Sequence, residues 1–167
     1  MEVKFNEPKM IDILVDENRN IAIFTGELID SIGEYKKIMY YICTELKAPY
    51  TESELADAIK IAMTEENKQP FFCYDQKKNK TYEEVYYGIK GFNKAMKGKR
   101  MVDVGYNNRW GKYASLNMPD KRGYSYTGVN LLYLDDNADW EDYAKGVIKL
   151  IDFDPKKDKF VYKERQE

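Results

Sequence analysis

The 167-residue chain has no histidine, only two cysteines and only five prolines. Without histidine it lacks the commonest general base and metal ligand, and Ser–His and Cys–His catalysis are excluded. No apolar run approaches the roughly 18 residues of a membrane-spanning helix. The N-terminal sequence MEVKFNEPKMID carries acids where a signal peptide has an apolar segment. We therefore expect a cytoplasmic protein that is not an enzyme, binds no cofactor or metal and does not enter a membrane.

The composition is that of a folded protein. Apolar residues make up 43% of the chain and charged residues 34%, which suffices for one buried core and a well-solvated surface. At this length we expect a single domain over residues 1–167. Cys43 falls on the apolar face of a predicted helix and Cys73 within an apolar run. Two buried thiols are favoured over a disulfide in a reducing compartment.

The formal net charge of −2 conceals a segregation of charge along the chain. Residues 1–67 carry 14 acids and 7 bases, whereas residues 68–122 carry 13 bases and 5 acids. Residues 134–154 are acidic again, with 7 acids and 2 bases, and residues 155–167 are weakly basic. Two interpretations stay open. Either the segments neutralise one another in the fold, or one of them forms a single-sign face that steers a partner.

The first half of the chain predicts a hairpin followed by two helices. Apolar runs at 11–15 and 21–24 flank a turn that contains asparagine, which is typical of a β-hairpin. Apolar residues three and four apart, behind a Ser-x-x-Glu capping box, predict a helix over 31–48. A second capping box, Thr51-x-x-Glu54, starts the next helix.

The second half predicts a mixture of strands and helices. We expect strands over the following ranges: 71–74, 101–106, 112–118, 126–134 and, at the end, 160–162. Helices are expected to start at Thr81, with an apolar stripe that continues to Met96, and at Asp139. The predicted fold class is α+β, with a mostly antiparallel sheet of five or six strands and four amphipathic helices, because the strands after residue 100 have connections too short for parallel crossovers.

Candidate catalytic groups are few. The densest acidic cluster lacks the spacing of a calcium-binding loop and lies where a helix N-terminus favours negative charge. Its members are Asp135, Asp136, Asp139, Glu141 and Asp142. Asp103 and Asp136, each near a predicted strand end, are a weak candidate for an acid–base pair. No glycine-rich phosphate-binding motif is present.

The basic segment 77–113 interleaves lysines and arginines with aromatic residues. Stacking combined with positive charge is how single-stranded nucleic acid is held, so nucleic-acid binding through this segment is an alternative function. Several of these aromatics fit core positions, and the sequence pI of about 5.5 argues against strong nucleic-acid affinity.

The tyrosines suggest a protein partner. The chain has 15 of them, and several do not fit any apolar stripe. Tyrosine, tryptophan and arginine dominate the energetics of protein–protein interfaces. Together with the acidic blocks, these outliers give a set of candidate partner-binding residues: Glu27, Asp30, Tyr41, Tyr106, Arg109, Trp110, Asp135, Asp136 and Glu141.

The opening hairpin IDILVDENRNIAIF and the segment SIGEYKKIMYYICTEL that follows it fall within residues 10–48. This combination resembles bacterial toxin-immunity proteins of the contact-dependent inhibition type. The resemblance implies a cytoplasmic inhibitor that occludes a toxin, such as a basic nuclease, through complementary charge. Our hypothesis is a non-enzymatic protein-binding module of this immunity type, and nucleic-acid binding is the alternative.

Overall fold

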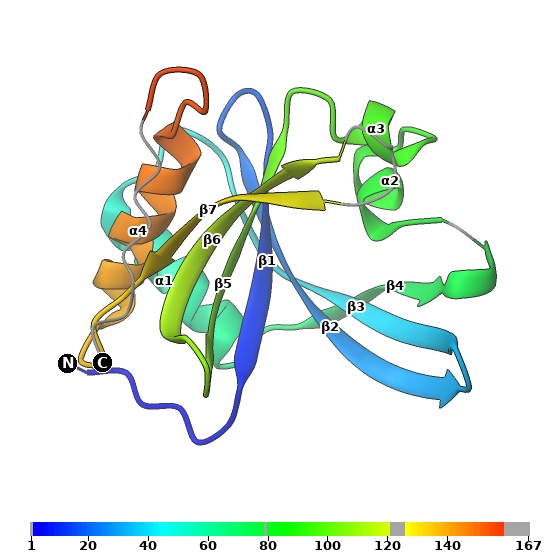
Figure 1. Ribbon diagram of the computed structural model, residues 1–167, viewed down its shortest axis with the longest axis horizontal. Helices are drawn as coiled ribbons and strands as arrows, with labels where there is room; N and C mark the ends of the chain where they lie inside the picture. The colour runs from blue at the N-terminus through cyan, green and yellow to red at the C-terminus, as the bar shows by residue number, and fades with distance from the viewer. Residues whose placement is uncertain (1, 79, 121–125, 159–167) are drawn as a thin grey trace.

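The computed structural model of the protein describes residues 2–78, 80–120 and 126–158, and its strands form one antiparallel sheet (Figure 1). The strand order is β4-β3-β2-β1-β5-β6-β7. The strands are β1 (Lys9–Val15), β2 (Ile21–Ile32), β3 (Tyr35–Leu46), β4 (Gln69–Asp75), β5 (Arg100–Asn107), β6 (Gly111–Pro119) and β7 (Tyr126–Tyr133). The helices are α1 (Glu52–Met63), α2 (Tyr82–Tyr87), α3 (Phe92–Ala95) and α4 (Trp140–Asp152), with one 3-10 turn, η1 (Gln76–Lys78).

Helices cover both faces of this sheet (Figure 1). α1 and α4 pack against one face and against each other, and they enclose the larger core. α2 and α3 lie on the opposite face, over a smaller core that contains Leu14 and Phe24. Ile13 and Val15 of the central strand β1 point into the larger core. A slip of one residue would exchange the two faces, so this alternation fixes the register of β1.

Three helix starts predicted from the sequence are confirmed. In each, the capping side chain accepts a hydrogen bond from the backbone N–H three residues later, and the carboxylate at that later position accepts one from the N–H of the cap. The pairs are Thr51 with Glu54, Thr81 with Glu84, and Asp139 with Asp142. Local sequence therefore determined where these helices begin.

The predicted helix over residues 31–48 is wrong, because this segment is the end of β2 and the whole of β3. Its apolar spacing suggested one helical face, but β3 is apolar on both sides. Ile42 packs in the smaller core and its neighbour Cys43 in the larger one. A strand covered on both faces loses the alternation that identifies strands. The apparent capping box instead encloses a hairpin turn in which Gly33 has a φ of +61°.

The α+β class and the antiparallel sheet are confirmed, but the sheet has seven strands instead of five or six because β3 is added. The helix predicted after Thr81 is interrupted, since Gly88 ends α2 with a φ of +65° and Gly91 precedes α3 with a φ of +95°.

Cys43 is buried, whereas Cys73 is exposed on the edge strand β4, so the predicted burial of the second thiol is wrong. The strand predicted at 160–162 lies outside the described residues. No helix of the described part has both the length and the apolar character needed to cross a membrane.

Two β-bulges turn the β2–β3 hairpin into a projecting arm. β1 pairs with β2 as far as Phe24, whereas β2 continues to pair with β3 as far as Ile32. The β2–β3 register shifts beside Phe24 and again between Leu28 and Asp30. The first shift leaves Cys43 of β3 as the extra residue, and the second leaves Ile29 of β2. Such bulges bend and twist the β2–β3 pair, and β2 has no pairing with β1 beyond the first shift. We call residues 25–38 the arm, and Figure 1 shows it extending beyond the rest of the sheet.

Gly105 of β5 provides a test of the packing beside β1. A Cβ at this position would lie 2.3 Å from the backbone oxygen of Lys9 and 3.0 Å from the Oη of Tyr113. We expect Gly105→Ala to lower the free energy of unfolding by about 1–3 kcal/mol, because the backbone of β1 must move to make room. Urea unfolding measures the change. Gly128→Ala is the control, since its Cβ would make an ordinary contact of 3.7 Å with Asn117, and equal costs for the two variants would contradict this account.

Candidate functional site

A pocket of about 410 Å³ opens on the face of the sheet that carries α2 and α3. Strands β1, β3, β4, β5 and β7 contribute to its walls together with both helices. Its lining consists of Met10, Asp12, Tyr40, Tyr74, Thr81, Tyr82, Glu83, Phe92, Met101, Asp103 and Tyr126. We call it the acidic pocket, because three carboxyl groups and four tyrosines, but neither lysine nor arginine, are among the described residues that line it.

Two of the carboxyl groups face each other across neighbouring strands. Asp12 of β1 and Asp103 of β5 are register partners, and both side chains lie on the pocket side of the sheet. Tyr82 donates a hydrogen bond from its hydroxyl to Oδ2 of Asp12 at 3.0 Å, and Asn117 donates one to Oδ2 of Asp103 at 3.1 Å. Burial raises the pKa of both carboxyl groups, and the charge of Asp103 raises the pKa of Asp12 further.

The Asp12–Asp103 pair is incompletely satisfied. Oδ1 of Asp103 is buried and has no hydrogen-bond partner among the described residues. Burial of the two acids beside each other raises the pKa of both, which favours a state in which one of them keeps its proton.

Glu83 is the third carboxyl group and lies on α2, only 4% exposed. The hydroxyl of Tyr126 donates a hydrogen bond to its Oε1 at 3.0 Å. Burial raises the pKa of Glu83 to about 7 in spite of this hydrogen bond. Burial together with the nearby carboxylates also raises the pKa of Tyr82 and Tyr126 above the usual tyrosine value, so both hydroxyls remain donors at neutral pH.

The chemistry of the acidic pocket is that of a proton reservoir and a binding site for positive charge. Glu83 changes its protonation state near neutrality, and the raised pKa values of Asp12 and Asp103 favour a state in which one of them keeps its proton. The sequence analysis considered Asp103 and Asp136 as an acid–base pair, and this pairing is wrong. Asp103 faces Asp12 instead, and Asp136 lies in the β7–α4 connection. Among the described residues, no three carboxylate or thiol groups converge in a way that could hold a metal ion.

Three of the candidate partner-binding residues lie on or beside the arm. The hydroxyl of Tyr41 donates a hydrogen bond to Oε2 of Glu27 at 3.2 Å, and the ammonium of Lys68 lies 4.4 Å from the centre of the Tyr41 ring. Asp30 follows the second bulge of β2 and is exposed. The arm also exposes four large apolar side chains, of which the last two fall in the segment that the sequence analysis predicted as a helix: Leu28, Ile29, Ile32 and Tyr35.

The other six candidates lie at the β5–β6 turn and at the start of α4. Tyr106 stacks on Phe5 with ring centres 5.3 Å apart, and half-buried Trp110 packs edge-on against Tyr113 at 5.2 Å. Arg109 is exposed in the turn. The remaining three are the acids Asp135, Asp136 and Glu141. The nine candidates thus form two separate groups on the surface.

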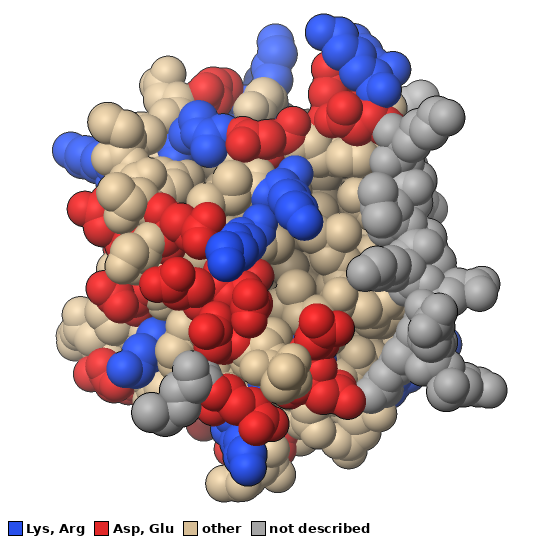
Figure 2. Space-filling model, turned by 90° about the vertical axis from the view of Figure 1, so that its left-hand side faces the viewer, with Lys and Arg blue, Asp and Glu red and all other residues tan. Residues whose placement is uncertain are grey.

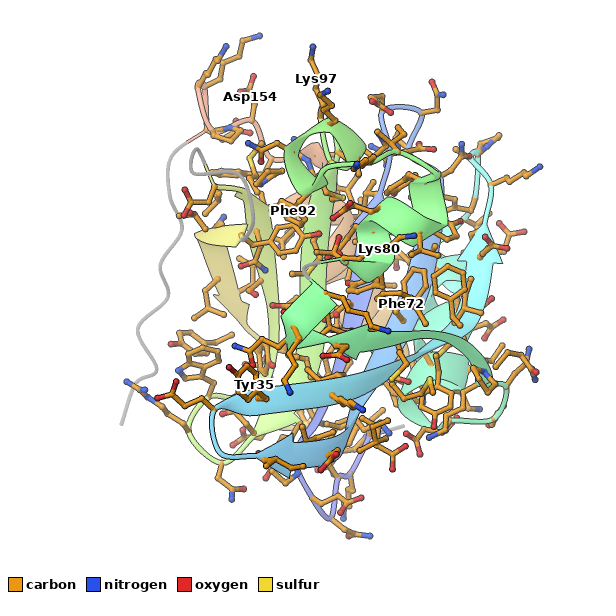
Figure 3. All side chains as sticks on the ribbon, turned by 90° about the vertical axis from the view of Figure 1, so that its right-hand side faces the viewer. Tyr35, Phe72, Lys80, Phe92, Lys97 and Asp154 are labelled. Atoms are coloured by element: carbon orange, nitrogen blue, oxygen red, sulfur yellow. The ribbon has the colours of Figure 1, made fainter. Side chains whose placement is uncertain are left out.

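The segregation of charge along the chain becomes a segregation between two sides of the molecule. α1, α4 and the loop before α4 carry nine acids and three bases, and Figure 2 shows how acids gather on this face. We call it the acidic face. Exposed lysines surround α2 and α3 on the opposite side, and Lys97 points outward in Figure 3. They are Lys77, Lys78, Lys80, Lys90, Lys94 and Lys97.

The aromatic residues of the basic segment are not arranged for base stacking. Tyr82 and Phe92 are buried in the smaller core, and Phe71, Phe72 and Tyr86 pack against it. Their rings contact one another, as in the Phe24–Tyr82 pair with centres 4.9 Å apart. The lysines of this segment therefore lie on the surface without the exposed ring platforms that single-stranded nucleic acid requires.

The sequence analysis missed the residues of the acidic pocket, with the exception of Asp103. One signal for Asp12 was visible: it is the single charged residue in the apolar strand sequence IDILV. A carboxylate amid buried residues is costly unless it has partners, and such residues cluster at functional sites. Glu83 and Tyr126 carry no comparable signal, because only the tertiary structure brings α2 beside β7.

Comparisons with known proteins support the fold alone. No protein family and no curated protein matches the sequence. Among solved structures, the fold is similar to that of a protein of unknown function, NMB0488, from Neisseria meningitidis. The TM-score is 0.55 at 15% sequence identity, and the match covers 89% of this chain and 98% of that chain.

The raised pKa of Glu83 predicts a specific dependence of stability on pH. Its folded pKa is about 7 and its ordinary value is 4.5, so between these pH values the folded state retains a proton that the unfolded state has released. This contribution to stability is complete below the ordinary pKa and is lost as the pH rises through the folded one. The interval corresponds to about 3 kcal/mol of unfolding free energy.

Glu83→Gln should remove this dependence, because glutamine stays neutral and still accepts the hydrogen bond from Tyr126. We expect the variant to gain about 3 kcal/mol relative to the native protein between pH ~5 and pH ~8, measured by urea unfolding across that range. Glu141→Gln, in the exposed first turn of α4, is the control. Parallel pH profiles for the native protein and Glu83→Gln would show that Glu83 ionises normally.

Proposed function

We propose that this chain is a non-enzymatic protein-binding module that inhibits a partner protein by covering it. The observation that carries the proposal is the apolar surface of the arm. Leu28 is 58% exposed, Ile29 50%, Ile32 73% and Tyr35 54%. Several large apolar side chains exposed on one hairpin are typical of an interaction surface in a folded protein. Burial of these four side chains against a partner would stabilise the complex by several kcal/mol before the cost of association.

The root of the arm offers a groove for part of such a partner. Where β2 leaves β1, a groove of about 540 Å³ opens between the start of β1 and the arm. Met10, Leu28, Ile38 and Tyr40 line it together with the acids Glu7 and Asp12 and the Lys9–Glu65 ion pair, whose charged atoms lie 2.6 Å apart. Beyond Phe24, β2 pairs with β3 on one side, and the opposite edge faces this groove within the described part of the chain. An apolar segment flanked by basic residues would fit it.

The charge distribution favours a basic partner. The acidic face and the arm residues Glu27 and Asp30 present negative charge on the same molecule. A field of one sign raises the association rate with a partner of opposite sign and suppresses binding to acidic proteins. The most specific form of the proposal is an immunity protein that neutralises a toxin with a basic working surface, such as a nuclease. This form comes from the resemblance of residues 10–48 to immunity proteins, for which the structure keeps the opening hairpin but has the end of β2 and β3 in place of the predicted amphipathic helix.

Nucleic-acid binding through residues 77–113 remains the alternative, and the exposed lysines around α2 and α3 are the observation in its favour. Because the aromatic rings of this segment pack against the protein core, nucleic acid would be bound through contacts between lysines and phosphate groups. Such binding is weak and steeply dependent on salt. Fluorescence anisotropy with labelled single- and double-stranded oligonucleotides at low salt distinguishes the two functions.

A growth assay tests the proposed inhibition. The candidate toxin is sought among the genes that neighbour the one encoding this chain. Induction of the cognate toxin in a laboratory bacterium should stop growth unless this chain is co-expressed. We expect the double variant Leu28→Asp and Ile32→Asp to lose protection and at least about a hundredfold in affinity, because central apolar anchors dominate binding. Ile89→Asp is the matched control, since Ile89 is also exposed but lies between α2 and α3. Full protection by the arm variant would overturn the role of the arm.

Association and dissociation kinetics with the purified partner test the predicted charged and aromatic residues. We expect Asp135→Lys, Asp136→Lys and Glu141→Lys together to slow association by about tenfold at low salt, because they weaken long-range attraction. Tyr41→Ala should instead speed dissociation, and so should Trp110→Ala if the partner reaches the β5–β6 turn. Biolayer interferometry separates the two rates. Unchanged rates in both sets would place the interface elsewhere.

A further inference from the structure

Among the described residues, the lining of the acidic pocket is electrostatically unbalanced. Three carboxyl groups reach it from β1, β5 and α2, and no described lysine or arginine lines it. Within the pocket, the carboxyl groups receive hydrogen bonds from neutral donors: the hydroxyls of Tyr82 and Tyr126 and the amide of Asn117. Buried carboxylates are normally paired with a cation, so the pocket has a place for one.

The remaining walls are suited to a cation that carries carbon atoms. Tyr40 and Tyr82 stack with ring centres 4.2 Å apart, and Phe92 meets Tyr126 edge-on at 5.0 Å. Aromatic rings attract ammonium and guanidinium groups, and the surface of this protein shows three such contacts, for example Lys99 over Tyr87 at 4.6 Å. Met10 and Met101 add flexible apolar surface at the pocket.

The unsatisfied oxygen of Asp103 gives the ligand a defined contact. Its Oδ1 is buried and has no hydrogen-bond partner among the described residues. An N–H group of a bound cation would donate to this oxygen, and its positive charge would favour the ionised form of both carboxyl groups. Hydrogen bonds between an ammonium or guanidinium group and carboxylates are among the strongest in proteins.

We propose that the acidic pocket is a binding site for an organic cation, an ammonium or guanidinium group on a short aliphatic chain. The pocket volume of about 410 Å³ lies in the range of small-ligand sites and exceeds the need of a single metal ion. Anions are repelled by the three carboxyl groups, and neutral polar ligands leave their charge uncompensated. The pocket shares Met10, Asp12 and Tyr40 with the groove at the root of the arm, but its occupant is a small cation, and calorimetry tests its binding without the partner protein.

Isothermal titration calorimetry of the full chain at pH ~8, above the pKa of about 7 of Glu83, tests the proposal. The probes are 1,4-diaminobutane and agmatine, with 1,4-butanediol as the neutral match. We expect both cations to bind at least about tenfold more tightly than the diol. Two tripeptides distinguish the source of the cation: acetyl-Ala-Lys-Ala-amide and its norleucine analogue. Tight binding of the lysine peptide would identify a protein side chain as the natural ligand. If the diamine binds and the lysine peptide does not, the natural ligand is a free amine.

Variants connect binding to the pocket. Asp103→Asn removes one charge with little change in shape and should weaken diamine binding by at least about tenfold, whereas Asp57→Asn on the exposed side of α1 should have no effect. Met10→Lys provides a second test that leaves every carboxyl group in place. Its ammonium would enter the pocket from the rim, compete with the diamine and raise the thermal stability. The proposal would be overturned if the diamine and the diol bound equally well. It would also be overturned if both pocket variants bound the diamine as tightly as the native protein, or if magnesium chloride alone saturated the pocket.

Discussion

The burial of β1 on both faces is the constraint on which the rest of the structure depends. Ile11, Ile13 and Val15 pack under α1 and α4, and Leu14 packs under the smaller layer of α2 and α3. A strand in this position must be apolar on both sides and must pair along both edges, which β2 and β5 provide. Asp12 is the exception, since it lies among these residues and requires polar partners. Those partners, Tyr82 and Asp103, bring α2 and β5 to the acidic pocket.

The point at which the pairing of β1 with β2 ends also explains why the arm projects from the molecule. Because β2 has no pairing with β1 beyond Phe24 and the bulges bend the β2–β3 pair, the distal half of this hairpin leaves the layered body. Its side chains lose the cover of the helices, and four large apolar residues become exposed. The groove at the root of the arm exists for the same reason, since it occupies the space in which β1 and β2 would otherwise have paired.

Charge acts on two scales in this protein. On the surface, acids on α1 and α4 oppose lysines around α2 and α3, which produces a long-range field that salt screens. Inside the acidic pocket, the low dielectric makes the same kind of charge costly, and the carboxyl groups respond with raised pKa values. The surface field acts on the approach of a partner, whereas the pocket acts on a group that has already entered.

Sequence by itself determined the local features: three helix starts, the first hairpin, the strands after residue 100 and the segregation of charge. Each depends on neighbours along the chain, such as the reciprocal hydrogen bonds of Thr51 and Glu54. The tertiary structure alone decided that residues 35–46 are a strand, because their apolar residues serve two cores at once and match a helical pattern by coincidence. The tertiary structure alone also brings together the residues of the acidic pocket. Asp12, Glu83 and Asp103 lie far apart in the sequence, and their pKa values and partners exist only after strand pairing and helix docking remove them from water.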